Sequence, residues 1–100
     1  MQKLQESDLA KLIRADLRAI GAKAPQYSGG ENVENLRAYL RRYCEPFLRG
    51  LIKEGVIADF KIGISTTFFY YPKLRVIFKN QKYFEVPLSG VYPIKAGLIV

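Results

Sequence analysis

The feature that most constrains the fold is a change in the spacing of apolar residues near Gly55. Before Gly55, apolar side chains recur every three or four residues, and after it apolar and polar residues alternate. The first spacing is that of a helix with one buried face, and the second is that of a strand with one buried face. Helices followed by strands predict an α+β fold, with two N-terminal helices packed on a mostly antiparallel sheet of three to five strands.

Two helices are expected before Gly55. Ser7 is a suitable N-cap for the first helix, and Gly21 can end it. Its apolar side chains recur at helical spacing: Leu9, Leu12, Ile13, Leu17 and Ile20. Residues 21–32 contain Pro25 and two adjacent glycines, which predicts a loop that is long enough to serve as a contact surface.

The second helix is expected to begin after Asn32, a good N-cap, and to stop at Gly55. One apolar stripe runs along it: Leu36, Leu40, Tyr43, Phe47 and Leu51. Pro46 lies inside this stripe, where a proline removes a backbone hydrogen bond and clashes with the preceding turn. We therefore expect the helix to be kinked or divided near Pro46.

Alternating residues predict strands at 60–64, 74–78 and 83–86, with a tight hairpin at Asn80-Gln81. Pro87 places the third of these at a sheet edge, or ends its pairing. Residues 94–100 alternate again and end in three apolar side chains, Leu98, Ile99 and Val100. An apolar terminus indicates burial, so we expect this last strand, or the edge beside it, to pair with a neighbouring subunit.

One hundred residues suit a single α+β domain spanning residues 1–100. No run of eighteen apolar residues is present, and residues 1–6 lack the apolar segment of a signal peptide. Cys44 is the only cysteine, so no internal disulfide can form, which fits a reducing, intracellular compartment. A soluble protein that does not enter a membrane is expected.

Catalytic chemistry has few candidate residues in this chain. The sequence contains no histidine, and residues 51–100 contain three carboxylates, Glu54, Asp59 and Glu85. A nucleophile needs a neighbouring base, and a metal site needs clustered ligands. Cys44 lies beside the apolar stripe and is interpreted as a small buried hydrophobe. We therefore expect no enzyme activity, no metal and no cofactor.

The net charge of +7 comes from 16 basic and 9 acidic residues. A basic face lies opposite the apolar stripe of the second helix and comprises Arg37, Arg41, Arg42, Arg49 and Lys53. Such a face is commonly just solvated. Its functional interpretation is docking on an acidic protein surface.

The run of aromatics at residues 68–71, together with Tyr83 and Phe84, lies close in sequence to several lysines and to Arg75. Because a strand alternates its faces, two of the four aromatics in the run, Tyr70 among the candidates, must point away from the core. These two would anchor a protein partner or stack on the bases of a nucleic acid. Both interpretations stay open at this stage.

One stretch resembles a known family. Residues 45–49 read EPFLR, Gly55 and Ile57 follow, and residues 59–62 read DFKI. This pattern is similar to the C-terminal domain of contractile-tail sheath proteins of phages and related injection machines, in which a helix ending in such a segment leads through a glycine turn into a strand. Residues 74–78 and 92–100 correspond to the later strands of that domain, so the resemblance spans about two thirds of the chain.

The chain also departs from that family. It reads STTF at residues 65–68, where sheath proteins have a segment like CDETNN, and it is several times shorter than a sheath subunit. The resemblance therefore implies a small sheath-like protein that begins, caps or terminates a sheath, or that joins the tail to its baseplate or neck. It implies location in the virion tail after synthesis in the host cytoplasm.

The resemblance also implies a mode of assembly, because neighbouring subunits in such machines complete one another's sheets by strand addition. The expected function is thus a structural role in a homo- or hetero-oligomer with other protein subunits. Its expected partner-binding residues are Arg37, Arg41, Arg49, Lys53, Tyr70, Lys95, Leu98, Ile99 and Val100. The alternative function is a small basic module that binds RNA or DNA through aromatics exposed on a sheet.

Overall fold

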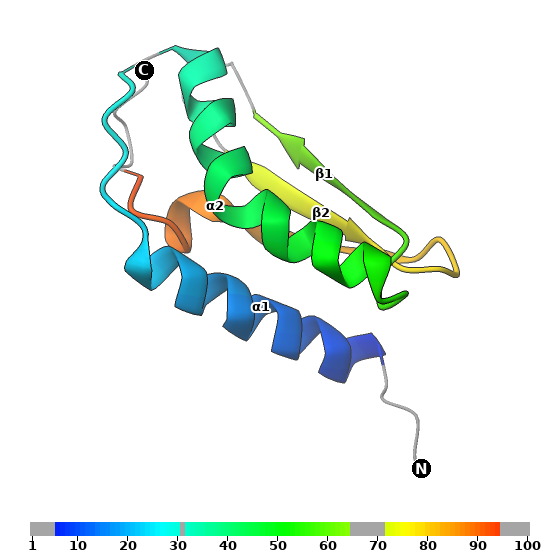
Figure 1. The fold of residues 1–100 in the computed structure, drawn as a ribbon. Coiled ribbons are helices and arrows are strands. Elements are labelled where there is room, and N and C mark those ends of the chain that lie inside the picture. Colours follow the sequence, from blue (N-terminus) through cyan, green and yellow to red (C-terminus); the bar gives the residue numbers. More distant parts are fainter. Residues whose placement is uncertain (1–5, 31, 65–71, 95–100) are drawn as a thin grey trace.

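The computed structural model describes residues 6–30, 32–64 and 72–94 (Figure 1). The expected α+β fold is confirmed, because two helices are followed by three antiparallel strands. In chain order the elements are α1 (Glu6–Lys23), α2 (Val33–Lys53), β1 (Asp59–Gly63), β2 (Lys73–Ile77), β3 (Tyr83–Pro87) and the short 3₁₀ helix η1 (Leu88–Gly90).

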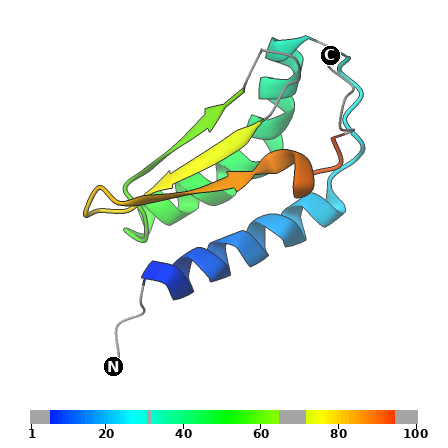
Figure 2. The ribbon, with the colours of Figure 1, turned by 180° about the vertical axis from the view of Figure 1, so that it is seen from behind.

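The molecule has two layers, with both helices on one face of the sheet (Figures 1 and 2). The strand order is β1-β2-β3, and both pairings are antiparallel. α2 lies over the β1 side of the sheet, and α1 runs along the β3 side (Figure 2). The guanidinium of Arg14 on α1 lies 5.0 Å from the centre of the Phe84 ring on β3. The two edges of the sheet therefore have different neighbours.

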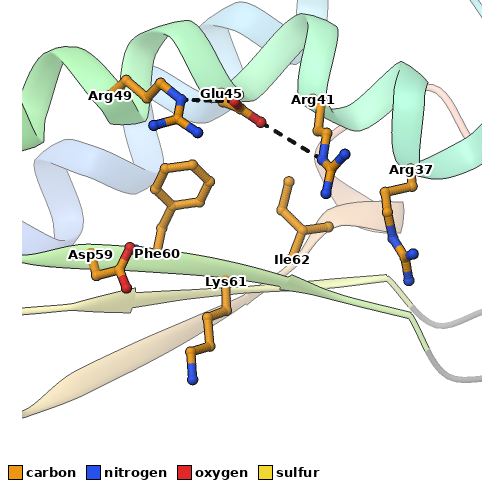
Figure 3. Close-up of a pocket in the computed structure, with 8 residues that line it drawn as sticks. All are labelled: Arg37, Arg41, Glu45, Arg49, Asp59, Phe60, Lys61 and Ile62. Atoms are coloured by element: carbon orange, nitrogen blue, oxygen red, sulfur yellow. Dashed lines mark hydrogen bonds and ion pairs between the residues drawn. The ribbon is translucent and has the colours of Figure 1, made fainter.

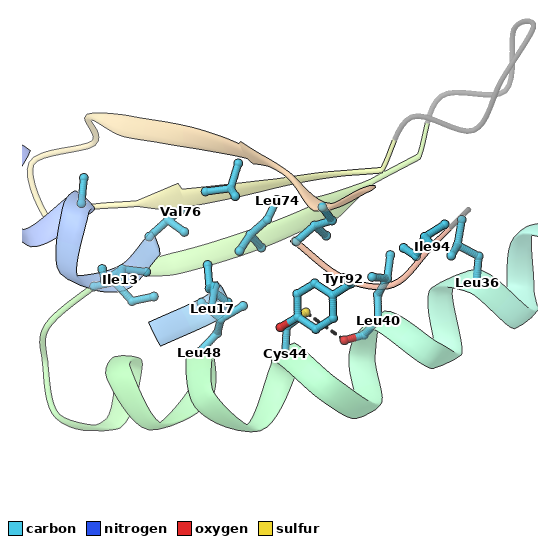
Figure 4. Packing of buried hydrophobic residues seen from close by; sticks show 14 of the residues in the cluster. Ile13, Leu17, Leu36, Leu40, Cys44, Leu48, Leu74, Val76, Tyr92 and Ile94 are labelled. Carbon is cyan, nitrogen blue, oxygen red and sulfur yellow. Dashed lines mark hydrogen bonds between the residues drawn. The ribbon is translucent and has the colours of Figure 1, made fainter. Parts of the chain in front are cut away.

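The core forms where the helices meet the sheet (Figure 4). Its fully buried members include Ile13 and Leu17 of α1 and Leu74 and Val76 of β2. α2 contributes a row with a spacing of four residues: Leu36, Leu40, Cys44 and Leu48.

The apolar stripe predicted for α2 was only partly right. Tyr43, Phe47 and Leu51 are half-buried at its margin, and Cys44 and Leu48 occupy its centre. The predicted stripe took one step of three, from Leu40 to Tyr43, and so passed to the neighbouring row, whereas the buried row keeps steps of four throughout. The prediction that Cys44 is a buried hydrophobe is confirmed.

Two details of α1 were predicted wrongly. Gly21 does not end the helix, which continues to Lys23, and Ser7 lies inside the helix instead of capping it. A Cβ atom at Gly21 would overlap the carbonyl oxygen of Val91, so this glycine serves the close approach of α1 to the segment after β3. Leu12 is 53% exposed and does not belong to the core.

The ends of α2 follow the predicted chemistry. The Asn32 side chain accepts hydrogen bonds from the N–H groups of Glu34 and Asn35. At the other end Gly55 has a φ of 78°, and the N–H of Val56 donates to the carbonyl of Leu51 at 2.8 Å. This is a Schellman motif, in which glycine adopts the left-handed conformation at low cost.

Pro46 bends α2 but does not divide it. The helix is continuous from Val33 to Lys53 with Pro46 inside it, and its axis changes direction part-way along (Figures 1 and 2). The missing N–H and the clash with the preceding turn explain the bend.

The predicted hairpin between β2 and β3 is confirmed. Ile77 pairs with Tyr83, and the N–H of Phe78 donates to the carbonyl of Lys82 at 2.7 Å. Gln81 in the turn has a φ of 73°, a conformation that suits Gly or Asn better than Gln. Pro87 is the last residue of β3, which lies at one edge of the sheet, as expected.

Two predicted features lie outside the described residues. These are the aromatic run at 68–71 and the part of the last expected strand from residue 95 onward. Ile94, where that strand was expected to begin, is buried in the core. Within the ranges that the structure describes, no helix is long and apolar enough to cross a membrane.

Candidate functional site

Three of the predicted arginines come together in one groove. Arg37, Arg41 and Arg49 of α2 face strand β1 across a groove with a volume of about 610 Å³ (Figure 3). They belong to one row along the helix because the numbers 37, 41, 45 and 49 differ by four. The groove thus lies between α2 and an edge strand of the sheet.

Glu45 occupies the remaining position of this row. Its carboxylate accepts a hydrogen bond from Nε of Arg49 at 2.7 Å and lies 3.8 Å from Nε of Arg41 (Figure 3). The Glu45 side chain is only 23% exposed, whereas those of Arg41 and Arg49 are 63% and 67% exposed. Glu45 therefore orients both guanidinium groups and leaves much of their surface accessible to a partner.

Strand β1 supplies an apolar floor to the groove. Phe60 and Ile62 point from β1 toward α2, while Lys61 points to the other side of the sheet (Figure 3). The guanidinium of Arg49 lies 5.9 Å from the centre of the Phe60 ring, within the range of a cation–π contact. Both Phe60 and Ile62 stay half-buried, so a partner could cover them further.

The pairing of β2 with β3 shows in which direction the backbone groups of each β2 residue point. Phe78 donates its N–H to Lys82, opposite it in the hairpin, so Phe78 directs its backbone groups toward β3. In an antiparallel sheet successive residues direct their N–H and C=O groups alternately to the two sides. Ile77 and Arg75 therefore direct theirs toward β1.

The same alternation identifies the outward groups of β1. Asp59 and Lys61 pair with Ile77 and Arg75, so their backbone groups point inward to β2. Phe60 and Ile62 alternate with them and direct their N–H and C=O groups to the outer edge. Among the described residues no strand pairs with this edge. The side chain of Asp59 accepts the Phe60 N–H at 2.8 Å, so one outward donor is already engaged.

The groove carries a positive charge balance. On α2, Arg37, Arg41 and Arg49 stand against Glu45, which gives +2, and the charges of Lys61 and Asp59 on β1 cancel each other. Arg37 also lies 3.3 Å from Glu34, a carboxylate that is 77% exposed. Exposed pairs of this kind are worth about 0.5 kcal/mol or less, so they exchange readily for a partner's carboxylates.

The sequence predicted part of this site, namely its three arginines. Lys53 lies at the next step of the row and is exposed, but it does not line the groove. Tyr70, Lys95, Leu98, Ile99 and Val100 lie outside the described residues. Glu45, Phe60 and Ile62 were missed as site residues, although Glu45 interrupts the arginine row at its own spacing, and this was the available signal.

The outer face of the sheet offers little aromatic surface in the described strands. Tyr83 is 53% exposed there, and the guanidinium of Arg75 lies 4.2 Å from its ring centre. Arg75 also pairs with Glu85 at 3.0 Å. Phe84 is half-buried on the opposite face, against α1. The one exposed ring is thus already covered in part by an arginine.

A second, shallower cleft of about 360 Å³ lies where the loop before α2 meets that helix. The rings of Tyr27, Tyr39 and Tyr43 form a chain with centroid separations of 5.3 and 4.9 Å. The Tyr39 hydroxyl donates to the carbonyl of Pro25 at 2.7 Å, and burial together with the neighbouring Tyr43 raises the pKa of Tyr39. These contacts hold the loop against α2.

The buried thiol of Cys44 is unsuited to nucleophilic chemistry. Burial, with a smaller contribution from the charge of Glu45, raises the pKa of Cys44 to about 12. Its Sγ–H donates to the carbonyl of Leu40 at 2.8 Å (Figure 4). The reactive thiolate is therefore scarce at neutral pH. Within residues 6–30, 32–64 and 72–94, no three side chains of His, Cys, Asp or Glu cluster as metal ligands.

Comparison of the chain with protein-family models, with curated proteins and with solved structures finds no match.

Proposed function

We propose that this protein is a non-catalytic structural subunit of a phage contractile tail or a related injection machine. It docks on sheath, tube, baseplate or neck proteins by strand addition, and the groove between α2 and β1 is its docking site. It acts as one member of a homo- or hetero-oligomer. Its place in a tail is proposed from the sequence resemblance at residues 45–62, and its mode of docking is proposed from the groove.

One observation carries the docking role, namely the outer edge of β1 beneath the arginine row, with which no described strand pairs. An unpaired edge strand presents N–H and C=O groups that can pair with another chain. Here that edge lies beside half-buried Phe60 and Ile62, and beside guanidinium groups that Glu45 orients. Backbone groups, apolar surface and charge coincide at one place, as they do where an added strand gains both affinity and specificity.

The alternative, binding of RNA or DNA, has less support in the described residues. Stacking platforms need exposed aromatic rings, and Tyr83 is the one exposed ring on the described outer face of the sheet. The arginines lie beside the edge strand β1, whose outward N–H and C=O groups can pair with the backbone of a protein strand, whereas a phosphate backbone has no N–H groups to donate. We therefore favour a protein partner.

The experiment compares two charge reversals on α2. A tagged copy is produced in the source cell, and contractile particles are purified and imaged by electron microscopy. We expect wild type and the control Arg42→Glu, whose guanidinium lies over the Tyr43 ring outside the groove, to be incorporated. We expect the double variant Arg41→Glu/Arg49→Glu to be folded but absent from particles.

Either of two results would contradict the proposal. The first is that the wild-type protein occurs in no such particle. The second is that it is retained on nucleic acid with an affinity that falls steeply with salt, which is the behaviour of a phosphate-backbone binder.

A further inference from the structure

We infer that the groove between α2 and β1 accepts an extended segment of a partner protein that carries carboxylates at every second residue. This inference rests on the proposed docking role and specifies the chemistry of the partner. It follows from three properties of the groove: the spacing of its arginines, the direction of the free backbone groups, and the state of its two acidic residues.

The spacing of the arginine row matches that of a strand. Residues four apart on a helix, such as Arg37 and Arg41, are separated by about 6 Å along the axis. Side chains on one face of a strand, two residues apart, are separated by about 6.6–6.8 Å. A strand added beside β1, which itself lies along α2, therefore meets successive positions of the row with successive side chains of one face (Figure 3).

The backbone of β1 decides which partner side chains face the arginines. The N–H and C=O groups of Phe60 and Ile62 point to the outer edge of β1. The side chains of both residues face α2. In an antiparallel pair, residues directly opposite each other have side chains on the same face. Partner residues that exchange hydrogen bonds with Phe60 and Ile62 therefore point their own side chains toward α2.

The chain's own sheet is antiparallel throughout its described strands, and antiparallel pairing is slightly more stable per residue than parallel pairing. We therefore assign the antiparallel direction to the added strand. The partner residues that bond to β1 are then the same residues that carry the carboxylates. The residues between them face Lys61 and the solvent side of the sheet.

The two acidic residues of the groove, Asp59 and Glu45, already bind groups that a partner must reach. Asp59 occupies the Phe60 N–H at 2.8 Å, so an incoming carbonyl must displace that carboxylate. Glu45 already pairs with Arg41 and Arg49, so the partner's carboxylates share these guanidinium groups with it. A segment with a single charge offers too little to offset both losses, whereas a repeated pattern reaches Arg37 as well.

The test uses a peptide of four Glu-Thr repeats, blocked at both ends. Its control has the same composition, with four consecutive glutamates followed by four threonines. Binding to the intact protein is measured by fluorescence anisotropy at physiological salt. We expect the alternating peptide to bind about tenfold more tightly than the control, because charge-assisted contacts then form along the whole row.

Charge reversal checks the role of the arginines. Arg41→Glu/Arg49→Glu is expected to weaken binding of the Glu-Thr peptide by about tenfold or more, and Arg42→Glu to change it by less than about twofold. A peptide of four Lys-Thr repeats is expected to bind the double variant more tightly than it binds wild type. Circular dichroism shows whether each variant is folded.

N-methylation checks the backbone pairing. Methylation of the glutamate amides removes donors that face β1, so we expect about a tenfold loss of affinity. Methylation of the threonine amides, which face away, is expected to have little effect. Equal affinity of the alternating and block peptides, or equal effects of the two methylations, would overturn the inference.

These results separate the inference from the proposed function. If neither peptide binds but the double variant is still lost from particles, the alternating-carboxylate partner is wrong and the docking role stands. If the alternating peptide binds as expected but the protein occurs in no particle, the contractile-tail assignment is wrong and the partner chemistry stands. Displacement of the alternating peptide by single-stranded DNA at an equal concentration would count against both.

Discussion

The two edge strands of the described sheet, β1 and β3, differ in how their outward backbone groups are protected. On β3, Phe84 and Val86 direct their backbone groups to β2, so Tyr83, Glu85 and Pro87 direct theirs outward. Pro87 has no N–H, so the outward row of β3 lacks a donor at its last position. The chain then turns into η1, where Leu88 is buried.

The β1 edge has no comparable closure among the described residues. Its outward donors belong to Phe60 and Ile62, and only the first is engaged, by the side chain of Asp59. A carboxylate can swing away, whereas a proline cannot regain its N–H. The outward side of β3 is thus blocked by covalent structure and packing, whereas on β1 a reversible side-chain contact, beside a basic groove, holds one of the two outward donors.

The substitution with the largest expected effect, Gly21→Ala, tests the packing of α1 against the segment that follows β3. Gly21→Ala forces a Cβ against the Val91 carbonyl, so α1 must move away from the segment after η1. We expect the free energy of unfolding to fall by about 1–3 kcal/mol, as in other overpacked sites. Gly50→Ala is the matched control, because nothing lies within 4 Å of its added Cβ, and we expect it to stabilise α2 by about 0.5–1 kcal/mol. Chemical denaturation measures both, and equal effects would contradict this account.

The next substitution, Asp59→Ala, tests the contact between the Asp59 carboxylate and the outward N–H of Phe60 on β1. Asp59→Ala releases the Phe60 N–H and removes one of the two acids of the groove. We expect the alternating Glu-Thr peptide to bind about three- to tenfold more tightly, while the stability of the isolated protein falls by about 1 kcal/mol or less. Anisotropy titration and denaturation measure the two quantities. Weaker peptide binding would show that Asp59 assists docking instead of opposing it.

The smallest effect tests whether the β3 edge can be opened. Pro87→Ala restores an outward N–H but leaves η1 and α1 in place. We expect a loss of about 0.4–1 kcal/mol in stability, because the unfolded chain gains freedom. Analytical ultracentrifugation should still show no new self-association. If the variant associates through β3, proline alone kept that edge closed, and the contrast with β1 is narrower than described.

Much of the fold could be predicted from the sequence because it depends on local chemistry. The change of period near Gly55, the Asn32 cap and the turn at residues 80–81 each act within a few residues of chain. Gly21 and Leu12 were misjudged because their roles depend on tertiary contacts. A glycine that admits the Val91 carbonyl looks, in sequence, the same as one that ends a helix.

Only the α2 side of the candidate site could be predicted from the sequence. The arginine row is visible in the sequence because helical spacing is regular, so Arg37, Arg41 and Arg49 were found. The partnership of that row with Phe60 and Ile62 depends on which strand lies under α2, and their outward backbone groups depend on the register. Neither the order of strands nor their register follows from an alternating pattern.

The most direct measurement of the central claim is amide hydrogen exchange, read by NMR, with and without the peptide of four Glu-Thr repeats. An added strand bonds to the outward groups of β1, so we expect exchange at the Ile62 amide to slow by about tenfold or more when the peptide is saturating. Exchange at the outward Glu85 amide of β3 is expected to stay unchanged. Protection at Glu85, or at neither amide while the peptide is bound, would contradict the claim that β1 is the docking edge.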